Sequence, residues 1–247
     1  MLNHDGSSRD MFDQIKKTTI ALEVARQIRR LILNGHIKPF QKLPPERELA
    51  SRFGTNRNTL REAIRLLEGE GLVKVRQGGG TEVLDFARTG SLALLQHYLQ
   101  DVEDTSKKLI FLADAVALRR EALGMVAMLA ASRHSDEDAE MIRSALSRVE
   151  QAVLENQGVA LADLEFFRTI AFAAGSMVLG WLVITVVEVF KGLLAQGNLF
   201  VMEENYLENM RQIAEAVLSR NAENAKAKVL EHFQATDKVL LEKLNGL

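Results

Sequence analysis

Three arginines, Arg57, Arg61 and Arg65, stand four residues apart in the N-terminal part of the chain. In a helix this spacing places all three side chains on one face. The planar guanidinium group can donate to O6 and N7 of one guanine, so such a face suits the edges of DNA bases. Asn58 can read an adenine or bond a phosphate. The alternative is a solvated helix face on which Glu62 pairs with the arginines.

The residues around the arginines predict a short helix, a tight turn and a second helix. Pro45 suits the first turn of a helix, and Gly54 supplies the break that ends it. Asn56 is a good N-cap for the second helix. Apolar residues recur at helical spacing opposite the arginines and predict the buried face of that helix: they are Leu60, Ala63, Ile64 and Leu67.

The segment after the second helix predicts a β-hairpin. Residues 72–76 alternate in polarity, residues 78–80 are three glycines, and residues 81–84 return. Helix, turn, helix and hairpin in this order predict a winged helix-turn-helix, whose second helix enters the DNA major groove. Glycines at the tip let the backbone approach a partner closely. The expected DNA-contacting residues are Arg47, Arg57, Asn58, Thr59, Arg61, Arg65, Arg76, Gln77 and Gly78.

Charge is divided unevenly along the chain. Residues 1–90 hold 16 Lys and Arg against 11 Asp and Glu, whereas residues 91–247 hold 15 against 22. A basic first part and an acidic second part favour a DNA reader joined to a controlling domain. A non-specific architectural DNA-binding protein is an alternative class, and such a protein would carry basic residues in both parts of the chain.

Beyond residue 90 the pattern is helical, with no proline after Pro45. We expect a mainly α protein: a winged helix-turn-helix domain over residues 1–84, a linker over 85–90, and an all-α bundle of about seven helices over 91–247. The bundle is the expected ligand-binding and dimerisation domain. The helices are expected near 91–101, 105–133, 136–156, 159–174, 177–197, 203–219 and 221–245.

One uncharged stretch, residues 169–187, is long enough to be considered as a membrane span. Gly175 and Ser176 interrupt it and predict a turn between two bundle helices, so we expect no membrane association. The polar residues 1–18 do not resemble a signal peptide, and the chain has no cysteine. These features agree with a cytoplasmic protein.

The sequence lacks the spacing of the common catalytic motifs. It has no cysteine nucleophile and no HExxH motif, and no Lys-Ser/Thr pair follows the three glycines as a phosphate loop would require. We therefore expect a regulator and not an enzyme.

The N-terminal segments PPERELASRF, NRNTLREAIRLLEGEGLV and GGGTEV resemble the GntR family of bacterial transcription regulators over residues 18–84. Residues 118–133, 163–179 and 213–232 resemble the helical ligand-binding domain of its FadR-like branch. The resemblance implies a homodimer that binds double-stranded DNA at a palindromic operator. It also implies a small-molecule effector, usually an organic acid and often beside a divalent metal.

The metal site of that family is expected to be incomplete in this chain. The family uses one Asp and three His, and the matching positions here hold Asp163, Phe167, Met210 and His232. One carboxylate and one imidazole are too few for a transition-metal site, so we expect no metal and no cofactor.

The same replacements favour an apolar effector. Phe167 and Met210 make the site less polar, as in the acyl-CoA-responsive regulators of the branch, and Trp181 adds apolar surface. Arg119 or Arg168 is the expected anchor for a carboxylate or phosphate. An acyl-CoA or fatty acid is the first expectation, and a small carboxylate held by either arginine is the alternative. Asp163 and His232 complete the expected ligand-binding set.

Overall fold

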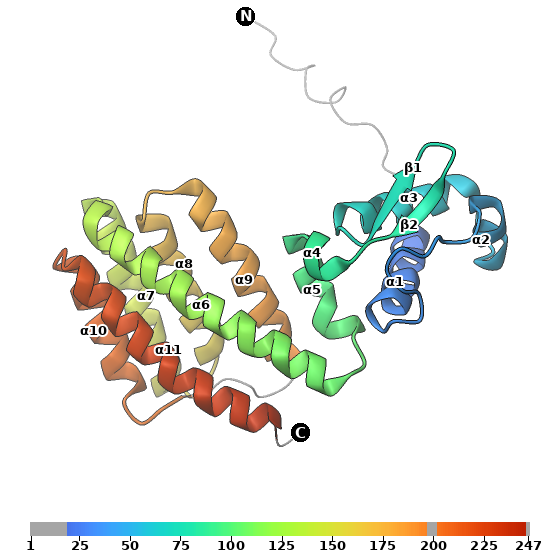
Figure 1. Cartoon of the computed structure of the whole chain (residues 1–247). Helices are drawn as coiled ribbons and strands as arrows, with labels where there is room; N and C mark the ends of the chain where they lie inside the picture. Colours follow the sequence, from blue (N-terminus) through green and yellow to red (C-terminus); the bar gives the residue numbers. More distant parts are fainter. Residues whose placement is uncertain (1–18, 197–201, 246–247) are drawn as a thin grey trace, which may run out of the picture. The chain divides into compact units, whose positions relative to one another are not determined.

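The computed structural model describes residues 19–196 and 202–245, and the chain divides into two compact units at Leu94 and Leu95 (Figure 1). The first unit contains a helix-turn-helix with a two-stranded wing, and the second is built from helices alone in its described residues. The predicted fold class is therefore confirmed.

The first unit is built around the two helices that the sequence predicted. Its elements are α1 (Thr19–Leu33), α2 (Glu46–Arg52), α3 (Arg57–Gly69), β1 (Val73–Arg76), β2 (Gly80–Val83) and α4 (Phe86–Thr89). The helix α3 packs on α1 and α2 through its apolar stripe, and Leu60 and Leu67 are fully buried. Gly54 adopts a positive φ of 60° in the turn between α2 and α3, a conformation that glycine tolerates best.

The wing is an antiparallel hairpin in which Val73 pairs with Val83 and Arg76 pairs with Gly80. The chain before α2 adds to its outer edge: Leu43 N–H donates to the Thr81 carbonyl and Val83 N–H donates to the Gln41 carbonyl. This additional edge was not predicted from the sequence.

The segment expected to be a linker folds as the one-turn helix α4 and packs against the end of α3. The Thr89 hydroxyl donates to the Gly71 carbonyl at 2.7 Å, and the Ser91 hydroxyl donates to the Gly69 carbonyl at 2.8 Å. A Cβ atom at Gly71 would lie 1.9 Å from the Thr89 carbonyl oxygen, so only glycine fits this contact.

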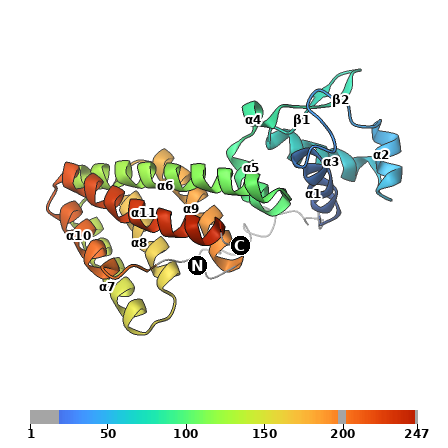
Figure 2. The same cartoon turned by 60° about the horizontal axis from the view of Figure 1, so that its bottom comes forward.

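The described residues beyond the linker form seven helices, the number that the sequence predicted. They are α5 (Leu92–Asp101), α6 (Thr105–Arg133), α7 (Asp136–Leu154), α8 (Val159–Ala173), α9 (Met177–Gln196), α10 (Tyr206–Leu218) and α11 (Ala222–Asn245). The long helices α6 and α11 lie side by side, with α8 behind them between α7 and α9 (Figures 1 and 2). Their shared core is apolar and contains Phe166, Ile170, Met210 and Ile213.

The uncharged stretch is divided as predicted. Helix α8 ends at Ala173, Gly175 takes a positive φ of 65°, and α9 begins at Met177. Across residues 19–196 and 202–245, none of the helices combines the length and apolar character that crossing a bilayer requires.

Candidate functional site

The first candidate site is the exposed face of α3. The Asn56 side chain caps the helix by accepting a hydrogen bond from Thr59 N–H at 2.9 Å, as the sequence predicted. Arg57, Arg61 and Arg65 are exposed, while the apolar stripe is buried. This division follows from the helical period, and it directs three guanidinium groups into solvent from one rigid element.

The arginines of α3 differ in their contacts. Arg61 donates from Nε to Oε2 of Glu46 on α2 at 2.9 Å, and both side chains keep solvent exposure. Within the described part of the chain, Arg57 and Arg65 have no ion-pair partner. Glu62, which sequence reasoning considered as the partner, is exposed. An exposed ion pair contributes about 1 kcal/mol or less, so a phosphate or base can displace Glu46 from Arg61.

A buried ion pair that the sequence analysis missed fixes the far end of α3. Arg29 on α1 donates from Nε and Nη2 to the two carboxylate oxygens of Glu70, at 2.7 and 2.6 Å. Both residues are about 5% exposed. Two parallel hydrogen bonds set direction as well as distance, so the pair holds α3 on α1 at the residue that ends the helix.

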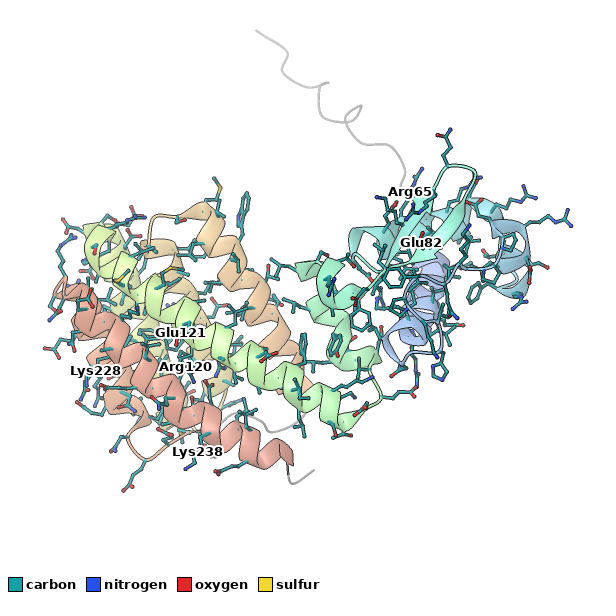
Figure 3. The ribbon with its side chains drawn as sticks, in the orientation of Figure 1. Arg65, Glu82, Arg120, Glu121, Lys228 and Lys238 are labelled. Carbon is teal, nitrogen blue, oxygen red and sulfur yellow. The ribbon has the colours of Figure 1, made fainter. Side chains whose placement is uncertain are left out.

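The wing carries three more candidates, Arg76, Gln77 and Gly78. Arg76, more than half exposed, pairs with Glu82 on β2 through an Nε–Oε2 distance of 2.7 Å. Gln77 and Gly78 form the exposed tip, where Gly78 has a φ of 70°. Figure 3 labels Glu82 on the wing and Arg65 on α3. Of the other candidates, Arg47 and Asn58 are exposed and Thr59 is half-buried.

The second candidate site is a cluster of polar groups inside the bundle. Asp163 on α8 accepts a hydrogen bond from the Tyr206 hydroxyl of α10 at 2.8 Å, and both residues are buried. Burial raises the pKa of Asp163 to about 6, although the Tyr206 hydrogen bond and the charge of Arg119 act to lower it. Burial and the neighbouring carboxylate raise the pKa of Tyr206. The tyrosine therefore stays a neutral donor to Asp163.

His232 on α11 lies in the same cluster. Its ring is 6.0 Å from that of Phe167 and 5.8 Å from that of Tyr206, measured between centroids. Its Nδ1 atom is buried and has no hydrogen-bond partner among the described residues. Burial lowers the pKa of His232 to about 4, and the positive charge of Arg119 adds to this effect. The imidazole is therefore neutral near pH 7.

Two arginines of α6 complete the cluster. Arg119 Nη2 donates to Oδ1 of Asp237 on α11 at 2.5 Å, and Arg120 Nη1 donates to Oδ2 at 3.2 Å. The Arg119 guanidinium also lies over the Phe233 ring at 4.4 Å. Burial raises the pKa of Asp237, and the two arginines oppose this. The positive charge of Arg119 therefore acts on Asp163 and His232 as well as on Asp237.

The structure brings together five of the seven expected ligand-binding residues. Phe167 and Met210 are buried beside the polar groups, whereas the side chains of Arg168 and Trp181 are exposed. Arg168 pairs with Glu165 of its own helix at 2.9 Å. Sequence reasoning missed Arg120, Tyr206 and Asp237, since each joins the cluster only through contacts between distant helices.

The cluster does not fit a divalent metal. Asp163 is engaged by a tyrosine hydroxyl, and Phe167 and Met210 offer no nitrogen or oxygen. No group of three or more potential metal-binding side chains of His, Cys, Asp and Glu occurs in the part of the chain that the structure describes. A stable transition-metal site needs three or four protein ligands.

Two family models match the two parts of this chain. The model of the bacterial regulatory proteins of the gntR family matches residues 20–83, and that of the FCD domain matches residues 114–235. An uncharacterized HTH-type transcriptional regulator of Mycobacterium tuberculosis is 32% identical over 86% of each chain. A fatty acid metabolism regulator protein of Edwardsiella ictaluri is 30% identical over 60% of each chain.

Among solved structures, a GntR protein of Streptococcus agalactiae has 26% sequence identity and a TM-score of 0.51, covering 89% of this chain and 99% of its own. The exposed arginines of α3, the wing and the helical bundle are thus parts of a transcription regulator and not of an enzyme. The chain belongs to the GntR family of bacterial regulatory proteins, with a C-terminal FCD domain.

Proposed function

We propose that this regulator binds a palindromic DNA operator as a homodimer, with Arg57 and Arg61 reading bases. We further propose that its bundle binds an acyl-CoA or a fatty acid and that this binding changes operator affinity. The proposal rests on the presence, in one chain, of an exposed arginine face on α3 and a buried polar cluster in the otherwise apolar core of the bundle.

The DNA part of the proposal rests on the position of α3. Arg57 opens the helix, and the N-terminal residues of a recognition helix are those that reach base edges. One such helix covers only a few base pairs, and a second copy related by a two-fold axis doubles the contact. A palindromic operator is the DNA counterpart of that symmetry.

The effector part rests on the composition of the cluster. Ionisable groups are costly to bury, so a core that keeps Asp163 and His232, with Arg119 beside them, requires an explanation beyond packing. An effector with an anionic head and an apolar body matches the arginine and the surrounding Phe167 and Met210. Several relatives are named fatty acid metabolism regulator proteins, which supports an acyl effector here.

A small carboxylate is the second candidate. The Phe167 ring packs against Phe233 with centroids 4.8 Å apart, and Met210 has no exposed surface. This packing leaves the apolar side of the cluster closely filled. A short acid anchored by Arg119 needs less rearrangement of these side chains than a long acyl chain does.

The DNA proposal is tested by selecting operator sequences with the full-length protein and comparing Arg57→Ala with the wild type. Loss of a base-reading arginine should weaken binding to the selected site by about 1–3 kcal/mol and relax the preference at one position of each half-site. Arg143→Ala, an exposed arginine of α7 paired with Glu140, is the matched control. Equal loss on selected and random DNA would make Arg57 a phosphate contact only.

The effector proposal is tested by titrating operator binding with acyl-CoAs of increasing chain length, beside short dicarboxylates and sugar acids. A ligand that prefers one arrangement of the DNA-binding domains by about 1–3 kcal/mol changes operator affinity roughly 5- to 150-fold. A response that grows with chain length supports the acyl effector. If no acyl-CoA changes operator affinity while a short acid clearly does, the second candidate is favoured.

A further inference from the structure

Two guanidinium groups contact the single carboxylate of Asp237. Arg119 and Arg120 are consecutive residues of α6, yet both guanidinium groups turn to the two oxygens of this one carboxylate on α11. The Asp237 side chain is 4% exposed, while those of Arg119 and Arg120 keep 14% and 27%. Figure 3 shows Arg120 where α6 and α11 lie side by side. The carboxylate is enclosed, Arg119 is mostly buried, and Arg120 is the more exposed of the two arginines.

The contacts of Asp237 are those that a bound oxyanion would make. Two guanidinium groups on separate oxygens form the charge-assisted arrangement by which arginines recognise carboxylates and phosphates. Glu121, the other acid near Arg120, is exposed and lies 3.8 Å away, beyond hydrogen-bond distance. Asp237 is therefore the anion that this pair of arginines holds in the absence of another.

We infer that Asp237 occupies the place of the effector's anionic group, and that an effector binds by displacing this carboxylate from Arg119 and Arg120. The inference rests on the proposed function in that the displaced contact belongs to the proposed effector site. It assigns the ligand class as an oxyanion, carboxylate or phosphate. It also makes Arg120, which the sequence did not single out, a second anchoring residue.

Displacement of Asp237 would let the effector change the contact between two helices of the bundle. The Arg119–Asp237 contact connects α6 with α11, two helices that pack along their lengths. Replacing the carboxylate of α11 by that of a ligand removes this connection and retains the positive charges on α6. The internal carboxylate also sets a threshold, because it competes with every incoming anion.

The test uses Asp237→Asn in the full-length protein and inorganic phosphate and acetate as probes. Thermal unfolding of the bundle is measured against each anion at constant ionic strength. The half-saturating concentration should be at least about tenfold lower in the variant than in the wild type, since a contact closed nine-tenths of the time reduces apparent affinity tenfold. Whether phosphate or acetate is more effective distinguishes the two head groups.

The anion dependence of the variant's stability separates competition from a structural role. A purely structural Asp237 would lower stability on substitution with no anion-dependent recovery, and that result would overturn the inference. Glu231→Gln, which removes an exposed ion pair with Lys228 on the same helix, is the matched control and should show no gain in anion response. Asp237→Ser is the second variant if Asp237→Asn does not fold.

The double variant Asp237→Asn/Arg119→Gln locates the anion site. It should lose the anion response that the single variant gains, and a retained response would place the anion elsewhere and overturn the inference. These measurements use neither DNA nor an acyl-CoA. Failure of the acyl-effector proposal in the operator titration is therefore distinguishable from failure of the displacement.

Discussion

Two buried titratable groups of the bundle, Asp163 and His232, should make opposite contributions to the pH dependence of stability that nearly cancel each other. Burial raises the pKa of Asp163 from 3.8 to about 6 and lowers the pKa of His232 from 6.5 to about 4. The two windows overlap almost completely between pH 4 and pH 6.5. Replacing either residue should uncover the effect of the other.

The direction follows from the protons bound in each state. Between pH 4 and pH 6 the folded Asp163 holds a proton that the unfolded chain has released, so its contribution to stability falls as pH rises. Over nearly the same range the unfolded His232 holds a proton that the folded state excludes, so its contribution rises with pH. At about 1.4 kcal/mol per pKa unit, each contribution changes by about 3 kcal/mol.

The assay is urea unfolding from pH 4 to pH 7, followed by the fluorescence of Trp181, the only tryptophan of the chain, which lies in the bundle. Relative to the wild type, Asp163→Asn should gain about 3 kcal/mol in the free energy of unfolding as pH rises through this window. His232→Asn should lose about the same amount. His36→Asn, an exposed histidine of the first unit, is the control and should follow the wild type.

Parallel pH profiles in the wild type and both variants would refute the reasoning, because neither group would then differ between the folded and unfolded states. Opposite slopes of the wrong sign would mean that the folded bundle stabilises the charged forms. In that case the cluster would contain a solvated site and not a desolvated one.

Three further predictions concern the DNA-binding unit and the metal. Arg76→Ala should weaken DNA binding and lower the slope of log affinity against log salt by about one phosphate; an unchanged slope, measured by fluorescence anisotropy, would mean that the wing stays in solvent. Glu70→Ala should destabilise the first unit by about 3–5 kcal/mol, because it leaves Arg29 buried without its carboxylate; calorimetry showing less than 1 kcal/mol would contradict this. Exhaustive chelation should leave the melting temperature unchanged, and a stoichiometric metal in protein purified without added metal would oppose it.

The sequence predicted the elements of the first unit because their causes are local. The cap at Asn56 and the stripe from Leu60 to Leu67 depend on residues within one helix, and the structure confirms both. The ion pair of Arg29 with Glu70 joins residues 41 positions apart and has no periodic signature. Sequence reasoning could therefore place α3 but not the contact that holds its end.

The bundle shows the same limit in a different form. Arg168 follows Phe167 directly, but one step along a helix turns the side chain by about 100°, so one residue is exposed while the other is buried. The Arg119–Asp237 and Asp163–Tyr206 contacts span 118 and 43 residues, and only the tertiary packing of the bundle brings these residues together. A single sequence carries no record of such pairs.

The end of α3 is where the DNA-binding unit has both rigidity and a connection to the rest of the chain. Glu70 is bound to Arg29 of α1 through a buried ion pair. The neighbouring carbonyls of Gly69 and Gly71 accept hydrogen bonds from the hydroxyls of Ser91 and Thr89. A displacement of the segment that leads to α5 would therefore act on the C-terminal end of α3. Arg57 lies at the other end of the same helix, so under the proposed DNA contacts a rotation of α3 at its C-terminal end would also move Arg57. Within the first unit, these hydrogen bonds hold the segment from Thr89 to Ser91 against the end of α3.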